Sequence, residues 1–140
     1  MSFGIGCFVA TVLCLLSALH VYWALGGRGS FAAAIPEVSG RRALTPGPFM
    51  TLGVALALLL AALIVATRVG LWNAPPLPTL LARWGTWTVA AVFLARAIGD
   101  FRLFGFAKRV RGTRFARWDT RLYSPLCAAL GLAMLWIAMR

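Results

Sequence analysis

Few side chains in this sequence could take part in chemistry, and most of them lie beside strongly apolar segments. The chain of 140 residues has one histidine, His20, and three acidic residues, Glu37, Asp100 and Asp119. Histidine and carboxylates are the usual general acids and bases, but that role requires side chains that meet in space. Asp100 and Asp119 could act together if the fold joined them, although nothing in their spacing shows that it does.

The familiar signatures of enzymes, cofactor sites and metal sites are absent from the sequence. There is no Walker A motif, no H-E-x-x-H, no G-x-S-x-G and no haem attachment motif. Cys7, Cys14 and Cys127 form no C-x-x-C pair, and with one histidine they make a poor structural zinc site. We therefore predict no catalytic residue, no metal and no cofactor. We favour a non-enzymatic protein and leave an enzymatic role open.

A small set of polar residues could line a ligand site. His20 and Trp23 lie three positions apart in SALHVYWALGG, so they share one face of a helix. Arg96 and Asp100 lie four positions apart and could pair along a helix, although Arg before Asp is the weaker order. Ionisable groups at membrane depth suggest function by default. The candidate ligand-binding residues are His20, Trp23, Arg96, Asp100, Asp119 and Tyr123.

A purely structural interpretation of the same residues stays open. His20 lies beside Tyr22 and Trp23, and aromatic side chains of this kind anchor helices at the membrane surface. Asp119 lies among arginines in RWDTRLYSP, where it is expected to be ionised and paired, or to cap a helix. Salt bridges that tether the helix ends would need the same residues as a polar site.

The elements that must position these residues are apolar helices. The chain is 61% hydrophobic and only 12% charged. Four apolar segments, residues 3–25, 49–69, 80–98 and 122–139, are each close to the ~20 residues that cross a bilayer. The last begins near Ser124 and Pro125, a helix-start signature. Because backbone groups in hydrocarbon must be satisfied internally, we predict an all-α membrane protein with four transmembrane helices in a compact bundle, one domain over residues 1–140.

The positive charge predicts how the chain lies in the membrane. Of the Lys and Arg residues, Arg28, Arg41 and Arg42 lie in the first loop, seven more in the third, and Arg68, Arg83 and Arg140 on the other side. Ten against three places loops one and three in the cytoplasm and both termini outside. In a chain this apolar, the net charge of +11 indicates an anionic membrane surface as the partner and no nucleic acid.

The third loop mixes these bases with aromatic residues. Phe101, Phe104, Phe115 and Trp118 follow helical spacing, while Gly105 interrupts it. We predict a basic amphipathic loop that lies in the headgroup layer. The predicted contacts with lipid headgroups are Arg102, Lys108, Arg109, Arg111, Arg114, Arg117 and Arg121.

The stretches LHVYWALGG, IPEV and RAIGDFRLFGFAKRVRGTRFARWDTRLYSPLC, with the final apolar run, resemble an uncharacterised family of small four-span bacterial membrane proteins. The resemblance implies a four-helix domain in the bacterial cytoplasmic membrane. It implies no activity, cofactor or site residue.

Two functions follow as hypotheses. The first is a non-enzymatic accessory or structural subunit of a membrane complex, joined to a membrane protein partner or to further copies of itself. The alternative is a membrane-embedded binding protein or enzyme for a lipophilic ligand, with a polar site near the cytoplasmic leaflet. Convergence of the candidate residues on one cavity would favour the alternative.

Overall fold

The computed structural model describes residues 1–27, 34–35, 37–38, 41–42, 46–72 and 76–140, and most of these are helical. The helices are α1 (Ser2–Ala24), α3 (Pro48–Arg68), α4 (Thr79–Ile98) and a continuous run of α5 (Arg114–Trp118), η1 (Asp119–Tyr123) and α6 (Ser124–Ala138). Between α1 and α3, β1 (Glu37–Val38) and β2 (Arg41–Arg42) pair antiparallel. Arg28 and the side chains of Glu37, Arg41 and Arg42 lie outside the described residues.

The helical prediction is confirmed for the first three segments, whose observed ends differ by one residue at most from those expected. The predicted start of the fourth, near Ser124, is wrong, because the helix already begins at Arg114. A π-helical turn at Asp119–Tyr123 makes this possible, with the Ser124 N–H donating to the Asp119 carbonyl. Pro125 has no N–H to donate, and a wider turn admits its ring within the helix.

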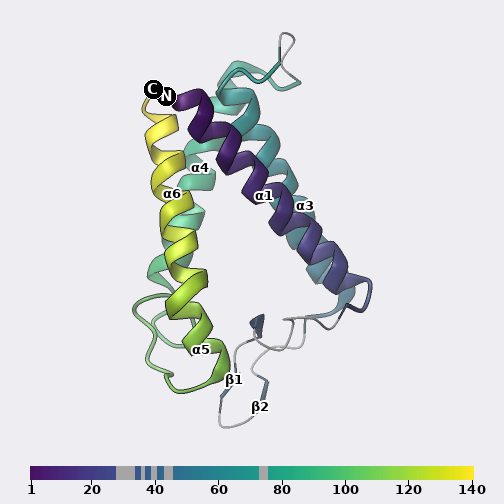
Figure 1. Ribbon diagram of the computed structural model, residues 1–140, viewed down its shortest axis with the longest axis vertical. Coiled ribbons are helices and arrows are strands. Elements are labelled where there is room, and N and C mark those ends of the chain that lie inside the picture. Colours follow the sequence, from purple (N-terminus) through teal and green to yellow (C-terminus); the bar gives the residue numbers. More distant parts are fainter. Residues whose placement is uncertain (28–33, 36, 39–40, 43–45, 73–75) are drawn as a thin grey trace.

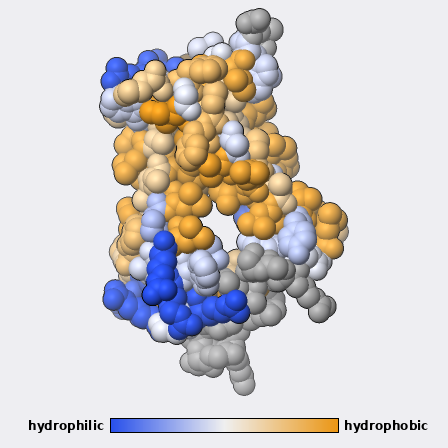
Figure 2. All heavy atoms as spheres, viewed as in Figure 1, coloured by the Kyte–Doolittle hydropathy of each residue, from blue (hydrophilic) through white to orange (hydrophobic). Residues whose placement is uncertain are grey.

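In the described part of the chain, three helical segments are long and apolar enough to cross a membrane: α1, α3 and the run Arg114–Ala138. The fourth, α4, is slightly shorter, at 20 residues, and less apolar, since it contains Arg83 and Arg96. Large apolar side chains are exposed along all four segments. Figure 2 shows them as a broad hydrophobic band with hydrophilic residues at both ends, and the larger hydrophilic group lies at the end that carries the loop before α5.

The helices form two pairs, α1 with α3 and α4 with α6, in which the contacts are most extensive (Figure 1). The pairs meet near the end that holds both termini and diverge toward the opposite end, where α1 ends and the loop after α4 lies. The buried core occupies the closed half, where Val9, Leu13, Val65, Leu130 and Met134 pack together. The hydrophobic core therefore does not extend into the open half, and other contacts must hold the helix pairs together there.

The loop between α4 and α5 folds tightly against the end of α4. The N–H groups of Phe106 and Ala107 donate to the Ala97 and Ile98 carbonyls, at 2.8 and 3.1 Å. Gly99 and Gly105 both have positive φ, and a Cβ on Gly105 would overlap the backbone of Gly99. Although Phe101 and Phe104 have helical spacing, no helix forms in this loop before Arg114. The loop is compact because the backbones of Gly99 and Gly105 touch, and a side chain at either position would prevent this contact.

Candidate functional site

A buried carboxylate, Asp119, organises the end of the molecule where the helix pairs diverge. Its side chain is fully buried, and four groups donate to it. The Arg96 Nη2 lies 3.0 Å from Oδ1, and Oδ2 accepts from the Lys108 ammonium at 2.9 Å, the Ser124 hydroxyl at 3.0 Å and the Gly105 N–H at 2.8 Å. A buried charge is tolerated when it is paired and hydrogen-bonded in this way. Asp119 thus joins α4, the loop and α6.

Lys108 lies inside this cluster, with 4% of its surface exposed. Its ammonium also donates to the Gly105 carbonyl at 3.0 Å and to the Thr120 hydroxyl at 2.7 Å. The prediction that Lys108 faces lipid headgroups is therefore not met, because its three donors are satisfied by protein oxygens. The six arginines predicted beside it for the same role are all exposed.

The residues expected to neutralise Asp119 are not the ones that do so. Arg117 and Arg121 lie two positions away on either side along the helix, which places them on the opposite face. Arg117 instead donates to the Gly112 carbonyl at 3.0 Å. Arg96, for which Asp100 was one possible partner along the helix, instead reaches Asp119 across 23 positions of sequence. Its guanidinium also lies 4.6 Å from the centre of the Phe104 ring.

Asp100 has a separate, local role at the start of the loop. One carboxylate oxygen accepts from the backbone N–H groups of Arg102, Leu103 and Phe104, at 2.9, 2.7 and 3.1 Å. The loss of some water contacts acts to raise the pKa of this exposed carboxyl group, but the hydrogen bonds outweigh it and hold the pKa of Asp100 below its ordinary value. They also support Phe101, whose φ of 61° is unusual for a residue other than glycine.

A cavity of about 570 Å³ lies between the two helix pairs in the open half. Its walls are mainly apolar and come from α1, α3, α4 and the continuous run of α5, η1 and α6, with Ala34 between α1 and α3. Figure 2 shows a hollow between the two halves of the visible face. The size falls within the range of about 300–1,000 Å³ that is common for small-molecule sites. The polar or ionisable side chains in its lining belong to His20, Trp23, Thr88, Arg96, Tyr123 and Cys127.

Four of the six candidate ligand-binding residues therefore meet at this cavity. His20 and Trp23 lie on the α1 wall, with their rings edge to face at 5.0 Å between centres. Arg96 and Tyr123 line it from α4 and η1. Asp119 does not line the cavity and acts through Arg96, while Asp100 belongs to the loop. Asp100 and Asp119 do not form an acid–base pair, since separate donors hold each of them.

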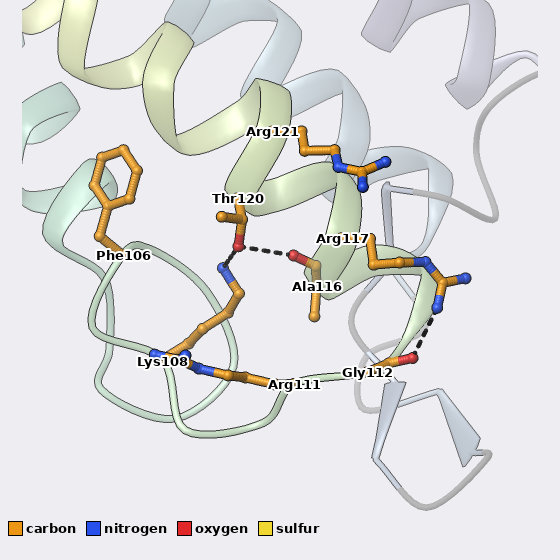
Figure 3. Close-up of a pocket in the computed structure, with 8 residues that line it drawn as sticks. All are labelled: Phe106, Lys108, Arg111, Gly112, Ala116, Arg117, Thr120 and Arg121. Carbon is orange, nitrogen blue, oxygen red and sulfur yellow. Dashed lines mark hydrogen bonds between the residues drawn. The ribbon is translucent and has the colours of Figure 1, made fainter.

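A second hollow, of about 290 Å³, lies on the basic surface beside α5. Arg111, Arg117 and Arg121 contribute to its lining together with Lys108 and Thr120. Figure 3 shows that Arg117 and Arg121 extend to one side, whereas Arg111 and Lys108 lie on the other. Because the guanidinium groups do not converge on one point, we interpret this hollow as part of the basic surface and not as a specific anion site.

Sequence reasoning missed part of the site. It placed Lys108 at the surface and did not foresee the contributions of Ser124 and the Gly105 N–H. The paired glycines Gly99 and Gly105 were the available signal, since a turn that tight can bring a buried donor to a carboxylate. Among the described residues, no three His, Cys, Asp or Glu side chains gather as metal ligands.

Comparison with known proteins agrees with the resemblance noted in the sequence. No curated protein and no solved structure matches the chain. A family model described as "Protein of unknown function (DUF3995)" matches residues 13–134. The match covers the second half of α1, all of α3 and α4, and the last helix up to residue 134, together with every residue that contacts Asp119. The chain therefore belongs to the DUF3995 family of proteins of unknown function.

Proposed function

We propose that this protein is an integral membrane protein that binds a lipophilic molecule in the cavity between its two helix pairs. The observation that carries the proposal is the cavity itself. It joins a mainly apolar wall with a few polar groups at one end, which is the usual character of a small-molecule site. A ligand there would place its apolar part among residues such as Val54, Leu58 and Phe93, and its polar part near Arg96.

The cavity favours this function over that of an accessory subunit. A subunit that acted only through helix packing would need apolar outer faces, and any membrane helix bundle has those. It would not need a hollow interior with an arginine in its wall. The closed half of the bundle, with Leu13 and Met134 fully buried, shows that this sequence packs tightly elsewhere.

We further propose that α4 is a fourth transmembrane helix in a bacterial cytoplasmic membrane. Its two arginines lie near its ends, where long side chains can reach the headgroups. The loops after α1 and α4 share one end of the molecule, in agreement with a cytoplasmic position for both (Figure 1). Alkaline phosphatase fused after Arg140 should then be active, and the same enzyme inserted at Arg109 should be inactive.

Six exposed arginines lie in the loop after α4 and in the first turns of the helix that follows it. We call this set the basic rim: Arg102, Arg109, Arg111, Arg114, Arg117 and Arg121. No carboxylate pairs with any of them in the described part of the chain. We propose that the basic rim lies against anionic lipid headgroups on the cytoplasmic side. Each such charge near an anionic surface contributes about 1 kcal/mol of attraction.

A substitution that fills the cavity tests the binding function. Ala57 lines the cavity from α3, so Ala57→Trp should displace a bound lipophilic molecule. Ala91 lies exposed on α4 and outside the lining, so Ala91→Trp is the matched control. Native mass spectrometry from mild detergent should show a small-molecule adduct on the wild type and on Ala91→Trp. An adduct kept by Ala57→Trp, or found on none of the three, would count against the proposal.

A further inference from the structure

We propose that the ligand in the central cavity carries negative charge on its polar head, and that this charge binds Arg96. The inference rests on the proposed binding function and specifies its substrate class as an anionic amphiphile. A carboxylate and a phosphate share the chemistry required. Three features of the structure point to it: the charge balance of the buried cluster, the way Arg96 is held, and the limited options of His20.

The buried cluster has one positive charge more than it can balance. Arg96 and Lys108 contribute +2 and Asp119 contributes −1, which leaves a net charge of +1. Lys108 is enclosed and its donors are all engaged, so the surplus is available at Arg96, which lines the cavity and keeps 32% of its side chain exposed. An uncompensated charge beside an apolar cavity is costly, and an anion in that cavity would offset it.

Arg96 is positioned before any ligand arrives. Its Nη2 donates to Asp119 at 3.0 Å, and the guanidinium rests on the Phe104 ring. A guanidinium has five N–H donors, and among the described residues Arg96 uses one of them. Nη1 is buried and has no protein acceptor there, so a ligand in the cavity would meet the donors that remain on Nε and Nη2. A group that is held in place and still has free donors binds an anion with little loss of side-chain entropy.

His20 on the opposite wall is suited to a different contact. Its Nδ1 lies 2.7 Å from the Leu16 carbonyl within α1 and must donate to it. A neutral ring therefore offers only an acceptor at Nε2, which suits a hydroxyl group better than an anion. Arg96 is thus the side chain in the cavity wall with the charge and the free donors that an anionic head requires.

Cys127 provides a direct readout, because it lines the same cavity. In a Cys7→Ser, Cys14→Ser background, Cys127 is the remaining thiol, and its rate of modification by N-ethylmaleimide reports occupancy. Oleate, monooleyl phosphate, oleyl alcohol and oleylamine share one chain and differ in the head. Added at equal mole fraction in the detergent micelle, oleate or the phosphate should protect Cys127 at concentrations about tenfold or more below those of the alcohol and the amine.

Variants at Arg96 assign this preference to its charge. Arg96→Gln should remove the advantage of the anions while protection by oleyl alcohol remains, and Arg96→Lys should keep part of it. Arg83→Gln, which removes an exposed charge at the far end of α4, should leave the advantage unchanged. Continued protection by oleyl alcohol also shows that the Arg96→Gln cavity has folded.

The outcomes separate the two proposals. If oleyl alcohol protects Cys127 as well as oleate does, or if Arg96→Gln keeps the preference for anions, the anionic head is refuted and the binding function stands. If none of the four compounds slows the modification of Cys127, both proposals fail. A preference for oleate over monooleyl phosphate, or the reverse, identifies which of the two anionic heads the cavity accepts.

Discussion

Replacing Asp119 with asparagine should destabilise the protein more than any other single polar substitution in the loop region. The change preserves the shape of the side chain and removes its charge. The Lys108 ammonium, 4% exposed, then remains buried without a counter-ion. Arg96 is affected less, because a third of its side chain is exposed and can be solvated.

The size of the effect follows from these contacts. Breaking a buried ion pair by removing one partner typically costs about 3–5 kcal/mol. Lys108 keeps its hydrogen bonds to the Gly105 carbonyl and to Thr120, so the lower end of that range applies. We therefore expect Asp119→Asn to reduce the free energy of unfolding by about 3 kcal/mol, or about a hundredfold in the folding equilibrium.

Reversible unfolding in mixed micelles, with sodium dodecyl sulfate as denaturant and far-ultraviolet circular dichroism as readout, measures this change. In a Lys108→Met background there is no buried lysine charge to lose its counter-ion. Asp119→Asn should therefore lower the free energy of unfolding by only about 1–2 kcal/mol there. Asp100→Asn, at an exposed position whose amide oxygen can still accept hydrogen bonds, is the control. Equal costs for Asp119→Asn in the two backgrounds, or a cost no larger than that of Asp100→Asn, would refute the reasoning.

Three further predictions concern the loop and the basic rim. Gly105→Ala should unfold the loop and cost more than Gly112→Ala in the same denaturation assay, because both residues have positive φ but only Gly105 has no space for a Cβ; equal costs would contradict this. Since the folded pKa of Asp100 is lowered, the stability that it adds to the loop is present above about pH 3.8 and is lost as the pH falls toward the folded pKa. Hydrogen exchange at Leu103, corrected for the intrinsic rate, should therefore accelerate in acid for the wild type, and a change of the same size in Asp100→Ala would argue against the carboxylate as the cause. Glutamine at three residues of the basic rim, Arg111, Arg117 and Arg121, should reduce the retention of phosphatidylglycerol in native mass spectra. Glutamine at Arg83 and Arg140 should not reduce it.

The helices of this protein could be predicted closely because lipid leaves the backbone few alternatives. A long apolar run must satisfy its own hydrogen bonds, so its limits coincide with those of a helix, as they do for α1, α3 and α4. The start of the last helix could not be predicted from Ser124 and Pro125. A proline in an α-helix signals an end, and the π-turn that admits it depends on the contacts of Asp119 within the fold.

The candidate site likewise has a part that the sequence predicts and a part that only the fold reveals. The sequence by itself determined which residues are polar in an apolar chain, and four of its six candidates, His20, Trp23, Arg96 and Tyr123, meet at the cavity. It also determined that the bases gather at one end. Only the tertiary structure decided which charges pair, because Arg96 and Asp119 are 23 positions apart and Lys108 enters through a turn of two glycines. Local spacing favours neighbours on one helix, whereas burial selects the partners that the packed helices bring together, and that selection leaves Arg96 in the cavity wall.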